Sequence, residues 1–495
     1  MKRFIRIITA LAVLMSALSI FTGCQELTNP VETEDLTAVQ SYTVNDSNFD
    51  LSQLKQYPNL KTLNLHGYRN YEAIMQYMRE NPQVEVSYHV LIGSQSYANN
   101  AEVLVFEDGE LPYEDVMSNL QYLPNVKKVL LPETTLSPEQ IRALQEAYPD
   151  ILLEYTLMFQ NNVYTCDTTE LNLSWMEPEQ IDEILNTITL LPNLQTIELM
   201  ASDGTSKLEL TDVKKLQDAL PQTFFNYSFD LFGKTVSTTD EVIEYDEVDI
   251  GNQGEERIRQ ALDILTNLTY FKVDNCGIDN EVMDGIRQDY PDVKVVWRVT
   301  IYPFSMLTDE TMLRLTFHMD DSNIEDLKYF HDVTYLDMGH NEQLTDISFI
   351  QYMPKLECVI LSGSLVSDLS YLSNCQELVW LELCFCSKVK DLTPIQDLPN
   401  LKYLNVSYSQ VEDLSPLENL DLERFNCMNT AVNWENENNF KKWHPDCLSI
   451  FKGVQPYGYG WRYNDHGYTF FEYYANMRII FRYDDESYYG NHKER

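Results

Sequence analysis

The most regular feature of the sequence is an apolar pattern, L-x-x-L-x-L, that returns at near-constant intervals in the C-terminal part of the chain. Its first positions step by 23, 22, 23 and 21 residues. The five occurrences are Val333/Leu336/Met338, Leu356/Val359/Leu361, Leu378/Leu381/Leu383, Leu401/Leu404/Val406 and Leu422/Phe425/Cys427. Because side chains alternate between the two faces of a strand, each L-x-L element turns its apolar residues to one side. The pattern predicts one short strand in every coil of the chain.

A turn motif follows four of these strands. It reads Asp-Ile/Leu-Ser/Thr and occurs at Asp346-Ile347-Ser348, Asp368-Leu369-Ser370, Asp391-Leu392-Thr393 and Asp413-Leu414-Ser415. One coil cannot bury its own apolar face, so only stacked coils make a core. With these motifs the sequence resembles the leucine-rich-repeat family, in the form found in internalin-like bacterial surface proteins. The resemblance implies an α/β fold, a leucine-rich-repeat solenoid with a parallel sheet on the concave face, and protein partners.

Residues 51–330 contain a longer and looser unit. Four asparagines, each before Leu or Val, open a strand: Asn59, Asn125, Asn193 and Asn267. Further on, Pro82, Pro149, Pro221 and Pro291 each precede a strand with an aromatic residue six positions later, at Tyr88, Tyr155, Tyr227 and Trp297. Each unit is about three leucine-rich periods long, which predicts a triplet of coils with helical returns such as 137–148 and 281–290. Each of these aromatic residues lies an even number of positions from apolar neighbours on its strand, as Tyr88 does from Val86 and Val90. It should therefore point to the same side as they do, and it is expected in the core.

The domain organisation follows from where these periods begin and stop. After residue 432 the period ends, and residues 451–489 are rich in Tyr, Phe and Trp. They are interpreted as a cap that closes the open end of the core, with an aromatic module for stacking on sugars as the alternative. The expected segments are a signal peptide (1–23), a lipidated Cys and disordered tether (24–50), divergent repeats in four triplet-like units (51–330), regular repeats (331–432) and an aromatic C-terminal cap (433–495).

The beginning of the sequence predicts export. Lys2, Arg3 and Arg6 precede an apolar run from Ile7 to Phe21, which is the layout of a signal peptide and is short for a membrane span. The following Gly23-Cys24 resembles the bacterial lipobox, which implies lipidation of Cys24. An ordinary cleaved signal is the alternative. The expected location is therefore the cell membrane, as a lipoprotein whose folded part lies outside the cytoplasm.

Composition narrows the class of partner. The chain has 35 Lys+Arg against 77 Asp+Glu, a formal charge of −42. Removing the signal would take away three basic residues, giving 32 minus 77, or −45. A charge of that sign repels phosphate backbones, so nucleic acid is not an expected partner. The hydrophobic fraction of 44% is ample for a core.

The sequence carries no recognisable catalytic or metal-binding motif. Its histidines show no H-E-x-x-H spacing, and no P-loop or G-x-S-x-G element occurs. Cys386 falls at a repeat position that is otherwise filled by Asn341, Ser364, Ser409 and Thr430, so a structural ladder explains it better than a redox or metal pair with Cys384. The remaining cysteines are expected to be buried free thiols. The sequence predicts neither a cofactor nor a metal, and no enzyme.

The candidate binding residues lie between the leucines, where side chains should project from the concave face. They are Tyr335, Asp337, His340, Trp380, Glu382, Phe385, Tyr403, Asn405, Tyr408 and Arg424. Exposed aromatic residues beside polar groups are typical of binding surfaces. The leading hypothesis is a non-catalytic surface binding protein, an adhesin or ligand-capture module, for an extracellular protein or glycan. The alternatives are envelope scaffolding without a soluble ligand and, less favoured, a glycan-active enzyme.

Overall fold

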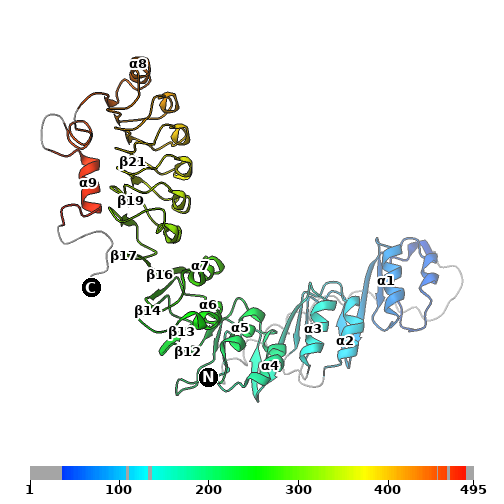
Figure 1. The fold of residues 1–495 in the computed structure, drawn as a ribbon. Helices are drawn as coiled ribbons and strands as arrows, with labels where there is room; N and C mark the ends of the chain where they lie inside the picture. Colours follow the sequence, from blue (N-terminus) through cyan, green and yellow to red (C-terminus); the bar gives the residue numbers. More distant parts are fainter. Residues whose placement is uncertain (1–35, 107–110, 132–135, 454, 465–468, 486–495) are drawn as a thin grey trace. The chain divides into compact units, whose positions relative to one another are not determined.

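The computed structural model describes residues 36–106, 111–131, 136–453, 455–464 and 469–485 (Figure 1). The expected signal peptide and Cys24 lie outside these residues. The chain divides into two compact units, one formed by residues up to 168 with 186–193 and the other by residues 169–185 with 194–495. Each unit is described by itself.

The first unit contains two modules of the same design. The first module comprises η1 (Leu36–Ala38), β1 (Ser41–Thr43), η2 (Leu51–Gln56), β2 (Thr62–Leu65), α1 (Tyr71–Glu80), β3 (Glu85–Ile92) and β4 (Gln95–Ala98). The second comprises β5 (Val103–Val105), α2 (Tyr113–Asn119), η3 (Leu120–Tyr122), β6 (Lys128–Leu131), α3 (Pro138–Ala147), β7 (Leu152–Phe159) and β8 (Asn162–Thr165). In both modules three parallel strands are followed by an antiparallel fourth.

The second unit begins with elements of the same kind, among them all of α4 (Ile181–Ile188) except its last three residues, which belong to the first unit. They are β9 (Glu170–Asn172), η4 (Pro178–Gln180), α4 (Ile181–Ile188), β10 (Thr196–Glu198), α5 (Leu210–Ala219), β11 (Phe224–Asn226), β12 (Ser228–Leu231) and β13 (Lys234–Ser237), then β14 (Val242–Asp246), η5 (Asn252–Gly254), α6 (Glu255–Ile264), β15 (Tyr270–Asp274), α7 (Asn280–Asp289), β16 (Lys294–Ile301) and β17 (Phe304–Leu307). β9–β11 and β14–β16 are parallel, and β12–β13 and β16–β17 are hairpins.

A seven-stranded parallel sheet completes the second unit (Figure 1). Its strands are β18 (Met312–Arg314), β19 (Tyr335–Asp337), β20 (Cys358–Ile360), β21 (Trp380–Glu382), β22 (Tyr403–Asn405), β23 (Arg424–Asn426) and β24 (Leu448–Ile450). The returns are η6 (Glu325–Tyr329), η7 (Ser348–Tyr352), η8 (Ser370–Asn374), η9 (Thr393–Ile395), η10 (Ser415–Leu417) and α8 (Trp434–Trp443), and α9 (Glu472–Ile480) follows the sheet. The sheet extends one strand beyond each end of the five predicted repeats.

The predicted parallel sheet is present in the regular repeats but does not continue through the long units. The residues that the structure describes form six separate sheets. Each long unit does have three parallel strands with helical returns, as the period predicts, but its third strand runs on into an antiparallel hairpin. In the first module the hairpin strand β4 lies on the side of β3 away from β2. The next strand along the chain therefore starts a new sheet.

The expected helical returns are present. Ser137 caps α3 by accepting a hydrogen bond from the amide of Gln140, whose side chain accepts from the amide of Ser137 in return. Pro138 occupies the first turn, where its missing N–H costs nothing. The helix buries Ile141 and Leu144. The second expected return is α7.

Part of the expected tether is ordered. Residues 41–43 form β1, which pairs in parallel with β2, and Val44 is buried. Asn59 donates a hydrogen bond to the backbone oxygen of Thr37 at 2.8 Å, which fixes the preceding turn. The prediction of disorder up to residue 50 is therefore wrong for residues 36–50, because the first coil needs a strand on this side of β2.

The recurring asparagines of the long units join successive coils. Their side-chain amides donate to backbone oxygens more than 20 residues upstream: Asn59 to Thr37, Asn125 to Asn99, Asn193 to Cys166 and Asn267 to Thr238. The recurring aromatic residues are buried, as expected, and the backbone amide of each donates to the side chain eleven residues later. These pairs are Tyr88–Asn99, Tyr155–Cys166, Tyr227–Thr238 and Trp297–Thr308. The asparagines and aromatic residues that recur in the sequence therefore make the same hydrogen bonds in each long unit.

The regular repeats pack as their pattern predicts. Leu336, Leu381 and Leu404 are fully buried. In each Asp-Ile/Leu-Ser/Thr motif the aspartate accepts a hydrogen bond from the amide two residues later, at 2.7–2.9 Å. Cys386 lies in the ladder, with its Sγ 3.1 Å from the Leu361 oxygen and 3.4 Å from Ser364 Oγ. The eight cysteines in the described part of the chain are free thiols, and six of them are buried.

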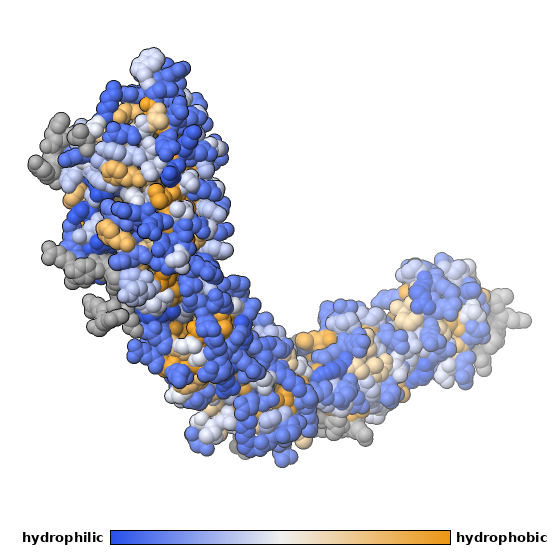
Figure 2. Space-filling model, viewed as in Figure 1, coloured by the Kyte–Doolittle hydropathy of each residue, from blue (hydrophilic) through white to orange (hydrophobic). Residues whose placement is uncertain are grey.

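The face of the molecule seen in Figure 2 is largely hydrophilic, with scattered hydrophobic residues. This distribution agrees with the large excess of acidic side chains. Within the residues that the structure describes, no helix is both long enough and apolar enough to cross a membrane.

We expect Asn267→Ala to lower the free energy of unfolding by about 1 kcal/mol, because it removes the 2.9 Å hydrogen bond to Thr238 that links two coils. Urea denaturation of residues 25–495 would measure the change. Gln396→Ala removes an exposed amide and is the matched control. Equal stability of the two variants would contradict a linking role for the asparagine.

Candidate functional site

The aromatic C-terminal segment, of which the structure describes residues 455–464 and 469–485, lies against the strands of the seven-stranded sheet. Figure 1 shows α9 beside these strands, on the side opposite the 3-10 returns. One buried cluster joins the two parts: Cys358, Ile360 and Trp380 from the strands, and Trp461, Phe471, Tyr474, Met477 and Phe481 from the segment. The expectation that these aromatic residues close the open end of the core is therefore wrong. They cover the strand face of the seven-stranded sheet instead.

Trp380 is fully buried under this segment, with 0% of its surface exposed. Its ring centroid lies 4.4 Å from that of Trp461, and it stacks on Tyr473 at 5.8 Å with an interplanar angle of 7°. The prediction that Trp380 projects into solvent is wrong, because an apolar side chain on the strand face is covered by rings from the segment. Its role is to hold the segment.

Glu382 is also fully buried, with 0% exposure, and is the main polar link to the segment. Its Oε1 accepts a hydrogen bond from the Arg462 guanidinium at 2.7 Å, and its Oε2 accepts from Trp461 Nε1 at 2.9 Å. Ser362 Oγ lies 3.2 Å from Oε1. A buried carboxylate needs such partners, because its desolvation is otherwise very unfavourable.

Asp337 is the second buried carboxylate of the strand face. The Tyr483 hydroxyl donates to its Oδ2 at 2.5 Å, and the Gly339 amide donates to its Oδ1 at 2.9 Å. Burial raises the pKa of the Asp337 carboxyl above its usual range, while these two hydrogen bonds act in the opposite direction. The expected exposure of Asp337 and Glu382 on the concave face is therefore wrong.

Four more of the predicted binding residues contact the segment or a neighbouring carboxylate. Asn405 is buried and donates to the Pro456 oxygen, and Arg424 donates to the Trp461 oxygen and lies over the Phe471 ring at 3.8 Å. Tyr403 and Tyr335 are half-buried and donate to Glu423 and Glu357, respectively. These side chains are occupied within the chain, which the alternation pattern alone could not indicate.

The remaining three, His340, Phe385 and Tyr408, stay accessible and share an unusual backbone conformation. They belong to a row of six equivalent positions with positive φ: Phe317 (73°), His340 (63°), Gly363 (81°), Phe385 (63°), Tyr408 (62°) and Asn429 (52°). We call these positions the left-handed row. Residues other than Gly and Asn rarely adopt this conformation, which costs them on the order of 1 kcal/mol each.

The left-handed row is fixed by the stacking of the coils. The backbone N–H of His340, Gly363, Phe385 and Tyr408 each donates to a carbonyl oxygen of the next coil at 2.7–2.8 Å. The aromatic side chains stack in pairs, Phe317 on His340 at 4.8 Å and Phe385 on Tyr408 at 4.3 Å. Phe317 is missing from the predicted set, although one further step of 23 residues before His340 would have found it.

A cavity of about 300 Å³ lies between the strands and the segment, next to Phe317 and His340. Its polar lining includes Asp337, Ser362, Glu382 and three arginines, Arg314, Arg462 and Arg478. Arg462 Nε is buried without a hydrogen-bond partner among the described residues. Within the residues that the structure describes, no group of three or more His, Cys, Asp or Glu side chains is placed to hold a metal ion.

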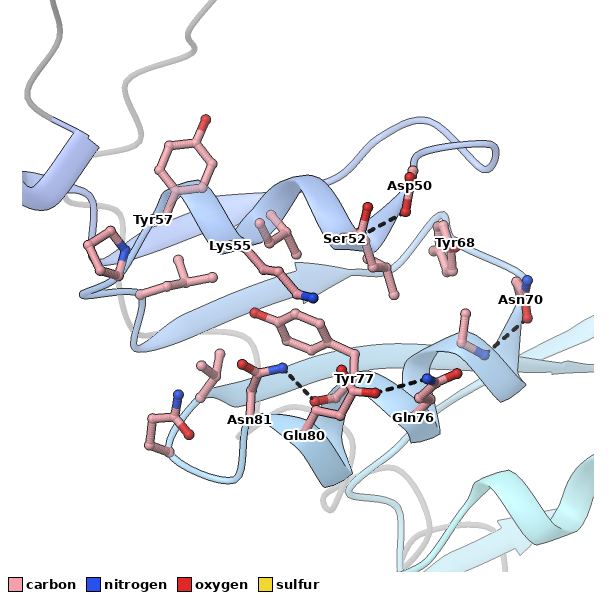
Figure 3. Close-up of a pocket in the computed structure, with 17 residues that line it drawn as sticks. Asp50, Ser52, Lys55, Tyr57, Tyr68, Asn70, Gln76, Tyr77, Glu80 and Asn81 are labelled. Carbon is pink, nitrogen blue, oxygen red and sulfur yellow. Dashed lines mark hydrogen bonds between the residues drawn. The ribbon is translucent and has the colours of Figure 1, made fainter.

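A larger cavity, of about 600 Å³, lies in the first unit between η2 and α1 (Figure 3). Lys55 and Tyr77 extend into it from the two helices (Figure 3). Hydrogen bonds among the residues that line it are local to the two helices, such as Gln76 to Glu80 and Asn81 to the Tyr77 oxygen. This cavity is a gap between neighbouring coils, and none of its polar contacts points to a ligand.

Comparison with known proteins gives likeness in solved structures alone. No family model and no curated protein matches the sequence. Similar structures include internalin F of Listeria monocytogenes (14% identity, covering 85% of this chain and 84% of that chain, TM-score 0.25) and a leucine-rich-repeat protein of Leptospira interrogans (15%, 84% and 97%, 0.25). The functional domain of Listeria monocytogenes InlJ is a third (15%, 85% and 69%, 0.22).

TM-scores this low do not establish a common shape, so the assignment of the fold depends on the repeats and strand pairing of the chain itself. The chain has an α/β fold of the leucine-rich-repeat type. The parallel strands, the 21- to 24-residue steps between them and the Asp turns carry this statement.

We expect Arg462→Met to destabilise the protein by about 3–5 kcal/mol, because it leaves the Glu382 carboxylate buried without its ion-pair partner. Urea unfolding would give the magnitude, and limited proteolysis would report detachment of residues 455–485. The control is Lys441→Met, which removes a half-exposed ion pair with Glu437. Similar effects of the two substitutions would contradict the role given to Arg462.

Asp337→Asn should raise stability near neutral pH. Since the folded-state pKa of Asp337 is raised, its contribution is fully present below the unfolded-state pKa of about 3.9 and is lost as the pH rises through the folded pKa. The advantage of the variant should therefore shrink as the pH falls towards 4. Thermal unfolding between pH 4 and 8 measures this, and a constant difference would contradict it.

Proposed function

We propose that this chain is a non-catalytic cell-surface binding protein, an adhesin or ligand-capture module. Residues 1–23 direct export, a lipid on Cys24 anchors the chain to the cell membrane, and the coils of the seven-stranded sheet act as a leucine-rich-repeat solenoid. The ligand is an extracellular protein or glycan. The acidic charge of the chain argues against nucleic acid and anionic surfaces.

The observation that supports binding best is the set of exposed rings in the left-handed row. Phe317 is 67% exposed and Phe385 is 42% exposed, and both hold a backbone conformation that suits Gly or Asn better. Exposed aromatic side chains concentrate at binding surfaces, where they supply most of the contact energy. We therefore assign ligand contact to Phe317, His340, Phe385 and Tyr408, and a supporting role to the buried part of the predicted set.

One observation favours the scaffolding alternative. The C-terminal segment already covers the strand face around Trp380 and Glu382, which is the surface that the sequence predicts for a ligand. A face occupied from within needs no soluble partner. In this alternative the coils space other components of the envelope, and no saturable ligand exists.

Binding of residues 25–495 to arrays of extracellular proteins and glycans would separate the two functions. We expect a saturable ligand whose affinity falls at least tenfold in the double variant Phe385→Asn/Tyr408→Asn, because Asn keeps the left-handed backbone and removes the rings. Trp434→Ala, which removes a 77% exposed ring on α8, is the control. Absence of any saturable ligand would favour scaffolding, and a ligand retained by the double variant would move the site away from Phe385 and Tyr408.

A further inference from the structure

We propose that the cavity beside Phe317 and His340 binds one unit of a neutral saccharide, with the sugar ring on the Phe317–His340 stack and its hydroxyl groups on the polar lining. This inference rests on the proposed binding function and names the chemical class of the ligand. It concerns the cavity that β18–β21 form with Tyr457, Arg462, Tyr474, Arg478 and Tyr483.

The stacked pair provides a flat apolar platform at the edge of the cavity. The two rings lie 4.8 Å apart with an interplanar angle of 5°, and Phe317 keeps 67% of its surface exposed. Burial of Phe317 within the chain therefore offsets little of its unfavourable backbone conformation. Strain held at an exposed position points to a function for the side chain, and a flat ring that faces solvent suits the apolar face of a sugar.

Two positions of the left-handed row carry residue types that adopt positive φ without strain. Gly363 and Asn429 occupy equivalent positions, and both residue types adopt positive φ readily. Gly363 also separates the Phe317–His340 pair from the Phe385–Tyr408 pair, so the first platform stands alone next to the cavity. The fold thus accepts Gly or Asn at this position, and the strained Phe317 is not required for the coil to form.

The polar lining contains both hydrogen-bond acceptors and donors. Asp337 and Glu382 contribute carboxylate oxygens, and Arg462 contributes a guanidinium whose Nε is buried without a partner among the described residues. A hydroxyl group both donates and accepts, so a ring that carries several hydroxyls satisfies both kinds of group at once.

The same lining disfavours the other small-ligand classes. An apolar ligand would cover the partly exposed guanidiniums of Arg462 and Arg478 without offering them an acceptor, which is unfavourable. An anion would lie beside Asp337 and Glu382 in a protein of formal charge −42, and a cation would lie beside the arginines. A volume of about 300 Å³ is at the lower end for small-molecule sites, which suits a single sugar unit within a longer glycan.

Isothermal titration of residues 25–495 with neutral oligosaccharides of glucose, galactose, mannose and N-acetylglucosamine tests the proposal, with a proline-rich peptide as a probe of a different class. At least one saccharide series should bind saturably. Phe317→Asn should weaken that binding at least tenfold while the melting temperature stays the same or rises, because Asn tolerates the left-handed backbone. Trp434→Asn, which removes a 77% exposed ring on α8, should change nothing.

The outcomes separate this proposal from the general one. Saccharide binding that Phe317→Asn leaves unchanged, or a fall in melting temperature in that variant, overturns the role given to the platform. A saturable protein or peptide ligand without any saccharide binding overturns the saccharide proposal and leaves the binding function standing. If neither saccharides nor proteins bind, both proposals fail.

Discussion

The stacking of short coils is the constraint on which the regular part of this molecule depends. β19 to β23 are three residues long, and a strand of that length is stable only with a paired neighbour on each side. Stacking fully buries leucines such as Leu381 and pairs each backbone with the next coil. Because every coil must repeat the same backbone path, every coil also repeats the same left-handed residue after its strand.

The strand face obeys a second constraint. It carries apolar side chains such as Cys358 and Trp380 beside two carboxylates, Asp337 and Glu382, and both kinds of group need a cover that suits them. The C-terminal segment supplies rings for the former and hydrogen-bond donors, chiefly Arg462 and Tyr483, for the latter. Buried carboxylates with few alternative partners also fix where the segment docks, since a shifted register would leave a charge unpaired.

The sequence predicts the parts of this structure that repeat. The leucine positions, the Asp turns, the Cys386 ladder and the helix at Pro138 all follow from period and local hydrogen bonding. The burial of Trp380 does not, because its partner Trp461 lies 81 residues away in a segment without any period. Alternation shows towards which face a side chain points, but it cannot show whether another part of the chain covers that face.

The predicted binding residues therefore fall into two groups, those that the C-terminal segment covers and those that it leaves accessible. Residues that look alike in the repeat, such as Trp380 and Phe385, have opposite fates, since one lies on a strand under the segment and the other lies at the left-handed position beyond it. Glycine or asparagine usually marks a left-handed position in a sequence, but within this row only positions 363 and 429 carry one of them. The other four positions can be found only from the repeat period. An aromatic residue there gives up intrinsic backbone stability, and stacking coils make that loss tolerable because their hydrogen bonds hold the backbone in place. A rigid row of this kind presents flat rings at the spacing of the strands, about 4.8 Å, without the entropy loss of ordering a flexible loop on binding.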